Sequence, residues 1–160
     1  MKTLHSLLVL GLLAPAALQG QDCRHSESLE IAQNVMEASR LKDMERLMSY
    51  FADEAVFRQA FNPGGERLHR GKEAIRKAYE QIFANIEELI YVESRYTVSL
   101  DGKTVFLEAQ GDMVVTATGA EYKNTHVFRV DFGDCSQIES LLQYANPLEI
   151  LRAFSPPEDP

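Results

Sequence analysis

The spacing of the apolar residues changes once along this chain, near residue 89, and that change constrains the fold more than any other feature. Before it, apolar side chains recur at helical spacing, most clearly in Ala74, Ile75, Ala78, Tyr79, Ile82 and Phe83. After it, apolar and polar residues alternate with a period of two, which is typical of strands. Helices followed by strands predict an α+β domain, with the helices on one face of a curved meander sheet.

The same patterns place the individual elements. Residues 28–41 predict a first helix, and Asp43 is the expected N-cap of a second, short helix whose buried stripe ends at Phe51. A strand is predicted over 54–59 and a turn over 62–65, where the sequence is Asn-Pro-Gly-Gly. The remaining predictions are a third helix after Gly71, strands over 92–100, 104–117, 121–132 and 137–145, and a short helical end after Pro147.

The first twenty residues have the pattern of a secretory signal peptide. Lys2 supplies a basic start, residues 7–18 form an apolar core, and small residues follow it, so that cleavage is expected after Gly20 or at Ala14-Pro15-Ala16. A membrane anchor is the alternative, but the apolar run has about a dozen residues, whereas a spanning helix needs roughly 20. We therefore expect a secreted protein (periplasmic if bacterial) with a folded domain over 21–153 and a disordered proline-rich tail over 154–160.

Export determines how the two cysteines are interpreted. Cys23 lies at the start of the mature chain and Cys135 lies far along it, and an even pair in an oxidising compartment predicts one disulfide. The chain has no Cys-x-x-Cys motif, and its histidines lack ligand spacing, so no metal site is expected.

The charge of the chain narrows the range of partners. Lys and Arg number 16 against 24 Asp and Glu, which gives a formal net charge of −8. Such a surface repels phosphate backbones and anionic lipid, so neither nucleic acid nor a membrane is expected as a partner. A small molecule or another protein remains.

Four segments resemble one known family. Residues 43–57, 70–75 and 122–130 are similar to the SnoaL-like branch of the nuclear transport factor 2-like superfamily, and residues 143–153 are similar to the tail of the phenazine-biosynthesis A/B proteins within it. The resemblance spans about residues 28–153. It implies a cone-shaped, curved antiparallel sheet wrapped around three helices, with a deep apolar pocket between them. It also implies a homodimer packed through the sheet and, in active members, chemistry without a cofactor.

The resemblance also points to site residues, with departures from the family pattern. Gln59 stands where ketosteroid-isomerase-like members carry Asp, and Gln143 stands where phenazine-type members carry Glu. His126 occupies the position of an acidic hydrogen-bond donor and is the best titratable candidate for an acid or base. Its strand also carries Tyr122 and Asn124, which we expect to act as hydrogen-bond partners to a substrate. The alternative is a core histidine satisfied by a backbone carbonyl or by Asn124.

Arg58 is a second charged candidate, because a guanidinium next to Gln59 would bind a substrate carboxylate. The alternative for Arg58 is an exposed surface arginine. His25 and His69 are expected to be solvated, the first near a terminus and the second in a polar loop.

Three functions remain open on this evidence. The first is a cofactor-independent isomerase, cyclase or lyase that acts on a hydrophobic secondary metabolite through His126. The second is a non-catalytic binder of such a molecule, which the loss of both carboxylates favours. The third is a dimeric interaction module, suggested by apolar residues on both faces of the last strand, with Ile138, Leu142 and Tyr144 on one face and Leu141 and Ala145 on the other.

Overall fold

The computed structural model describes residues 23–155. The predicted signal peptide and residues 156–160 of the predicted tail lie outside this range. The helices are α1 (His25–Arg40), α2 (Met44–Ser49), α3 (Lys72–Asn85) and α4 (Pro147–Phe154). The strands are β1 (Phe51–Gln59), β2 (Arg67–Arg70), β3 (Tyr91–Val98), β4 (Thr104–Val114), β5 (Glu121–Phe132) and β6 (Ile138–Ala145).

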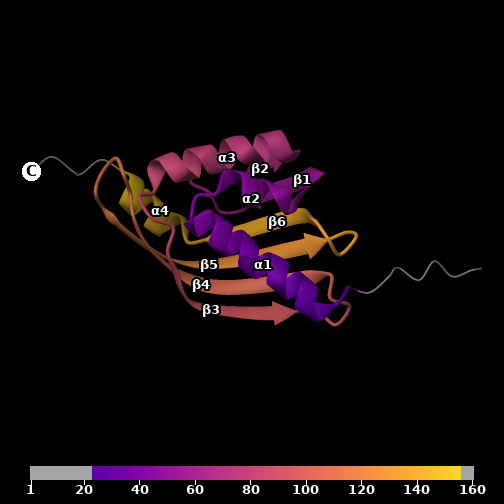
Figure 1. The fold of residues 1–160 in the computed structure, drawn as a ribbon. Coiled ribbons are helices and arrows are strands. Elements are labelled where there is room, and N and C mark those ends of the chain that lie inside the picture. Colours follow the sequence, from indigo (N-terminus) through magenta and orange to yellow (C-terminus); the bar gives the residue numbers. More distant parts are fainter. Residues whose placement is uncertain (1–22, 156–160) are drawn as a thin grey trace, which may run out of the picture.

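A single curved sheet forms the body of the molecule, with α1, α2 and α3 lying over one face and α4 at one end (Figure 1). Its strand order is β2-β1-β6-β5-β4-β3, so β2 and β3 are its open edges. The α+β prediction is confirmed. The expectation of a purely antiparallel sheet is wrong at one pair, because β1 and β6 run parallel. The chain leaves β1 before α3 and the β3–β5 meander, and it returns beside β1 in the same direction.

Phe51 begins β1, although helical spacing places it in the stripe of α2. Asp43 caps α2 as predicted, accepting a hydrogen bond from Arg46 N at 3.1 Å. The helix ends at Ser49 because the next residues hydrogen-bond to β6 instead: Ile138 N donates to Tyr50 O at 2.8 Å. Phe51 is nevertheless fully buried. The helical periodicity therefore predicts its burial correctly, but it predicts a helical backbone where the structure has a strand.

Strand β2 is the element that the sequence pattern does not predict. It pairs with β1 over four positions, from Val56 opposite Arg70 to Gln59 opposite Arg67. Three of its four residues are Arg or His, so its sequence lacks the apolar alternation that marks a strand. An edge strand on a hairpin tolerates such polarity because one of its sides is free.

Two irregularities change which side chains face the helices. A register shift between Val92 and Arg95, where Glu93 has φ +52°, turns Tyr91 toward the core and leaves Val92 43% exposed. Strict alternation along this strand would put Val92 on the same face as Tyr96 and Val98, and the register shift removes it from that face.

A second register shift lies at the start of β6. It separates the pair Phe132–Ile138 from the pair Asp131–Ser140. Ile138 consequently joins Leu141 in the core instead of sharing the face of Leu142, as the alternation predicts.

The start of the described chain is fixed to the far end of the sheet. The predicted disulfide between Cys23 and Cys135 is present, and Cys23 N donates to Asp101 O at 3.0 Å. Gly102, with φ +70°, approaches Cys23 so closely that a Cβ would overlap the Cys23 carbonyl oxygen. A glycine is required there for the N-terminal segment to pack on the hairpin.

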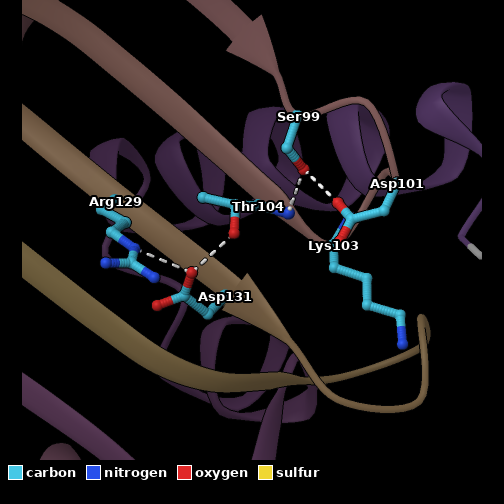
Figure 2. Close-up of polar contacts among 6 residues, drawn as sticks. All are labelled: Ser99, Asp101, Lys103, Thr104, Arg129 and Asp131. Atoms are coloured by element: carbon cyan, nitrogen blue, oxygen red, sulfur yellow. Dashed lines mark hydrogen bonds and ion pairs between the residues drawn. The ribbon is translucent and has the colours of Figure 1, made fainter. Parts of the chain in front are cut away.

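Side-chain hydrogen bonds stiffen this hairpin between β3 and β4 (Figure 2). Asp101 Oδ1 accepts from Ser99 Oγ at 2.6 Å and from Lys103 N at 3.0 Å. These two donors hold the pKa of Asp101 below its usual value. Thr104 Oγ1 donates to Asp131 of β5 at 2.8 Å, so the turn is also tied to the next strand.

Two groups of buried side chains make up the interior. The larger lies between the sheet and α1–α3 and includes Phe51, Phe57, Ile75 and Leu107. The smaller lies at the α4 end and consists of Ile86, Leu89, Met113, Val115, Tyr122 and Ala153. A cavity lies where these two groups meet.

Candidate functional site

The cavity has a volume of about 390 Å³, within the range of about 300–1,000 Å³ that is usual for small-molecule sites. Aromatic side chains dominate its interior, among them Phe57, Tyr79, Tyr91, Tyr122 and Phe128. Among the described residues, no Asp or Glu side chain lines it. The site is therefore an aromatic chamber with neutral polar groups and very little formal charge.

Two glutamines and a histidine form a hydrogen-bonded chain in the cavity wall. Gln59 of β1 and Gln143 of β6 are direct neighbours in the parallel pair. Gln59 Nε2 donates to Gln143 Oε1 at 3.1 Å, and Gln143 Nε2 lies 3.1 Å from His126 Nδ1. The structure thus brings together three residues that lie far apart in the sequence, and all three line the cavity.

The orientation of the Gln143 amide goes with one tautomer of the neutral His126 ring. With the Gln143 amide donating, Nδ1 is the acceptor, and the neutral ring carries its proton on Nε2. The side chain is only 2% exposed, and burial lowers the pKa of His126 from 6.5 to about 4. The imidazole is therefore uncharged at neutral pH.

The Nε2 atom of His126 is buried without a hydrogen-bond partner. It faces Gly111 of β4, where a Cβ would lie only 3.0 Å away. Aromatic rings surround the imidazole, with Phe128 stacked at 5.7 Å and Tyr91 and Tyr122 edge-on at 5.4 and 5.9 Å. A buried donor with no partner costs about 1–3 kcal/mol, and none of the described residues satisfies this nitrogen.

Tyr122 and Asn124 have different places. Tyr122 lines the cavity, and burial raises the pKa of its hydroxyl to about 12. Asn124 does not line the cavity; its Nδ2 donates to Tyr122 Oη and to Asn146 O, both at 3.0 Å. Asn146 N donates back to Asn124 Oδ1 at 3.0 Å. Asn124 thus fixes the start of α4, and its contact with the site runs through Tyr122.

Arg58 lies on the other face of the sheet. It points the opposite way from its strand neighbours Phe57 and Gln59 and does not line the cavity. Its Nε is 3.9 Å from Glu66 Oε2, and its side chain is 43% exposed. The geometry therefore matches the surface alternative, because alternation along β1 sends Arg58 away from the helices.

Two residues of the unpredicted strand β2 line the cavity instead. His69 is the cross-strand partner of Phe57, and Arg67 is the partner of Gln59. The His69 ring stacks on Phe57 at 5.7 Å, and its Nε2 is buried without a partner. Burial, and secondarily the charge of Arg67, lowers the pKa of His69. The expectation of a solvated His69 is wrong because residues 67–70 pair with β1 instead of forming a loop.

Burial also keeps the tyrosines of the cavity protonated. It raises the pKa of Tyr79 and of Tyr91 far above the usual value. With both histidines neutral, Arg67 is the one cation among the described residues that lines the cavity at neutral pH.

Within residues 23–155, no group of three His, Cys, Asp or Glu side chains is arranged to hold a metal ion. None of the helices in this range is both long and apolar enough to cross a membrane.

Comparison with known proteins identifies the family. The family model that matches is the SnoaL-like domain, over residues 32–138. The chain belongs to the SnoaL-like family. The resemblance stated from the sequence is thereby confirmed, and no curated protein sequence matches the chain.

Solved structures agree with this family assignment. A proposed isomerase from Bacillus subtilis is 27% identical with a TM-score of 0.73, over 81% of this chain and 93% of that chain. A proposed polyketide cyclase from Xanthomonas campestris pv. campestris is 18% identical with a TM-score of 0.71, over 82% and 98%. A phenazine biosynthesis-related protein from Pseudomonas aeruginosa is 17% identical with a TM-score of 0.67, over 94% and 96%. The last two likenesses concern the fold alone.

Proposed function

We propose that this SnoaL-like protein is a cofactor-independent isomerase, cyclase or lyase that acts on a hydrophobic metabolite in the aromatic cavity. The observation that carries the proposal is His126, a neutral imidazole that lines the cavity, with Nε2 unpartnered and Nδ1 held by Gln143. A hydrogen-bond donor in an apolar site stabilises negative charge that develops on a substrate oxygen, because little water screens it. The family and the proposed isomerase among its structural neighbours support the same class of reaction.

The two amides give His126 a property that carboxylates would not. Each amide group has both a donor and an acceptor end. If both rotate by half a turn, Gln143 Oε1 accepts from an Nδ1–H group, and Gln59 Oε1 accepts from Gln143 Nε2. Nε2 then has a free lone pair and acts as a base. The chain of two amides therefore lets His126 present either a donor or an acceptor with no change in the charge of the site.

A second candidate is a non-catalytic binder of the same kind of molecule. The specific observation in its favour is that no carboxylate lines the cavity among the described residues. The resemblance to the family implies acids at the positions that Gln59 and Gln143 occupy here. A pKa of about 4 also makes His126 a weak base near neutral pH.

Mass-spectrometric identification of a small molecule that copurifies with the protein, followed by a turnover assay, separates the two candidates. For an enzyme, His126→Gln keeps the volume and hydrogen bonding of the side chain but lowers the rate by about 10²–10⁴-fold. Stabilisation by the molecule without any conversion selects the binder. Equal rates for the wild type and the variant would exclude a catalytic role for His126.

Secretion is part of the proposal and rests on the sequence of residues 1–20, with the disulfide in support. Peptide mapping of exported material should find the mature protein starting between about residues 17 and 21. A chain that retains residues 1–16 would contradict it.

A homodimer packed through the outer face of the sheet is also proposed. Tyr144 of β6 lies half-buried on that face, beside Leu142, whose side chain the monomer already buries, and Phe106 of β4 is 40% exposed there. Such apolar side chains among ion pairs are typical of a surface that a second subunit covers. Light scattering should give about twice the mass of the mature chain, and a monomer at micromolar concentrations would contradict the proposal.

A further inference from the structure

The mouth of the cavity carries a positive charge. Arg67 lines the cavity but is itself exposed, as is Phe61, which is 59% exposed and also lines it. Deeper in the cavity Phe57, Tyr79 and Phe128 are at most 7% exposed. A molecule bound here would have its apolar body among the rings and one end beside the guanidinium group.

No acidic side chain neutralises this charge within the described part of the chain. Arg67 forms none of the ion pairs there, whereas Arg58, on the opposite face of the neighbouring strand, is paired with Glu66. The chain as a whole has eight more acidic than basic residues, and still no Asp or Glu among the described residues lines the cavity. The formal charge that the described residues contribute to the cavity lining is therefore opposite in sign to the net charge of the chain.

A second polar group lies beside Arg67. His69 also lines the cavity, and its Nε2 is buried without a hydrogen-bond partner. The two residues are on the same face of β2 because they alternate with Leu68 and Arg70. An anionic group that accepts hydrogen bonds would satisfy the imidazole nitrogen and the guanidinium together.

We infer that the ligand of this cavity is an amphiphilic carboxylate, whose flat apolar body enters the aromatic chamber and whose carboxylate binds Arg67 at the mouth. This inference rests on the proposed function, since it requires that the cavity binds a hydrophobic molecule. The class of that molecule is a small aromatic or polycyclic acid. A second polar group of the molecule, farther from the carboxylate, would contact His126.

A matched pair of probes tests the charge directly. Naphthalene-2-acetate and naphthalene-2-acetamide have nearly the same size and shape, but only the first is an anion at neutral pH. Isothermal titration calorimetry should show that the wild-type protein binds the carboxylate about 5- to 10-fold more tightly than the amide, as one partly exposed charge-assisted contact allows. The preference should shrink at high salt, because salt screens an exposed charge.

Arg67→Gln should abolish the preference for the carboxylate and leave the affinity for the amide unchanged. Arg70→Gln is the matched control, because Arg70 is on the same strand, is also exposed and points to the other face. This control should retain the preference. Arg67→Lys keeps the charge and should retain at least part of the preference, which separates loss of charge from loss of folding.

The outcomes are distinguishable. Equal affinities for the two probes in the wild type, or a preference that survives Arg67→Gln, overturn the inference and leave the cavity as a hydrophobic site. Failure of both probes to bind overturns the proposed function, and the inference with it.

Discussion

His126 remains uncharged because it is surrounded by three aromatic rings and receives a hydrogen bond from an amide instead of a carboxylate. Each of these neighbours is less favourable to an imidazolium than water is. The same burial that prepares the ring as a neutral donor therefore makes the folded protein sensitive to acid.

The pH dependence of stability should show this burial. The pKa of His126 is about 4 in the folded protein against 6.5 for a free histidine. Between these values the unfolded chain binds more protons than the folded protein, so the free energy of unfolding falls as the pH falls through this window. Above pH 6.5 the stabilisation that depends on a neutral His126 is fully present. Protonation of His126 lowers the free energy of unfolding by about 3 kcal/mol in total.

Urea unfolding followed by circular dichroism, which suits a chain without Trp, measures this effect. Wild type should lose about 3 kcal/mol more than His126→Gln between pH 7 and pH 4. The difference between the two proteins removes the contribution of the surface carboxylates. Parallel pH profiles would mean that His126 titrates normally.

Gln143→Glu should raise the pKa of His126 well above its wild-type value. A carboxylate at this position accepts a hydrogen bond from Nδ1–H, and its negative charge stabilises the imidazolium. Titration of the His126 ring signals by NMR measures the change. Gln33→Glu, an exposed position on α1, is the control and should leave the pKa unchanged. A pKa that stays near 4 in Gln143→Glu would show that the two side chains are not in contact.

The sequence predicts some of these residues and misses others for a definable reason. Alternation along one strand places His126 and Tyr122 on the same face without any knowledge of the fold. Alternation does not predict that Arg67 and His69 line the cavity, because their position depends on the pairing of β2 with β1. Proximity in the sequence to Gln59 points instead to Arg58, which lies on the opposite face of the sheet.

At the scale of elements, α4 closes one end of the cavity and depends on few contacts for its position. Ile150, Leu151 and Phe154 line the cavity, and Phe154 packs edge-on against Tyr122 at 5.7 Å. The polar attachment of α4 to β5 runs through Asn124 and Asn146. Phe154 is the last residue of this helix.

Asn124→Ala should loosen α4. It removes the two hydrogen bonds to Asn146 and leaves buried polar groups unsatisfied, which costs about 1–3 kcal/mol. The rate of hydrogen exchange should increase more for the backbone amides of α4 than for those of the sheet. Thr125→Ala, at the next position on the outer face, should change stability by no more than about 0.5 kcal/mol. Unchanged exchange in α4 would show that Asn124 does not hold it.

Helices with a clear apolar stripe and long alternating strands are predictable from this sequence, as α3, β4 and β5 show. Prediction fails where tertiary pairing overrides the local pattern. Phe51 fits the stripe of α2, but the pairing of Ile138 with Tyr50 draws it into β1. The bulge at Glu93 reverses the faces at the start of β3, and nothing in the residue pattern marks it.

For the molecule as a whole, the disulfide connects the start of the described fold to the turn between β5 and β6. Cys23 and Cys135 are 112 residues apart in the sequence, and closing so long a loop restricts the unfolded chain strongly. Replacing both by Ser should lower the free energy of unfolding by about 2–5 kcal/mol. Urea titration of the double variant, beside the wild type with and without reductant, measures the loss. Identical midpoints in all three samples would show that the bond adds no stability.

We propose that a small hydrophobic molecule binds in the cavity beside His126. NMR of the protein with isotope-labelled histidine, titrated with naphthalene-2-acetate, tests it most directly. His69 and His126 line the cavity, whereas the ring of His25 is bonded to Leu100 O at 2.8 Å in the β3–β4 hairpin. We expect the ring signals of His69 and His126 to move together to saturation while those of His25 stay in place. Saturable binding that leaves both cavity histidines unmoved would place the ligand elsewhere and contradict the account.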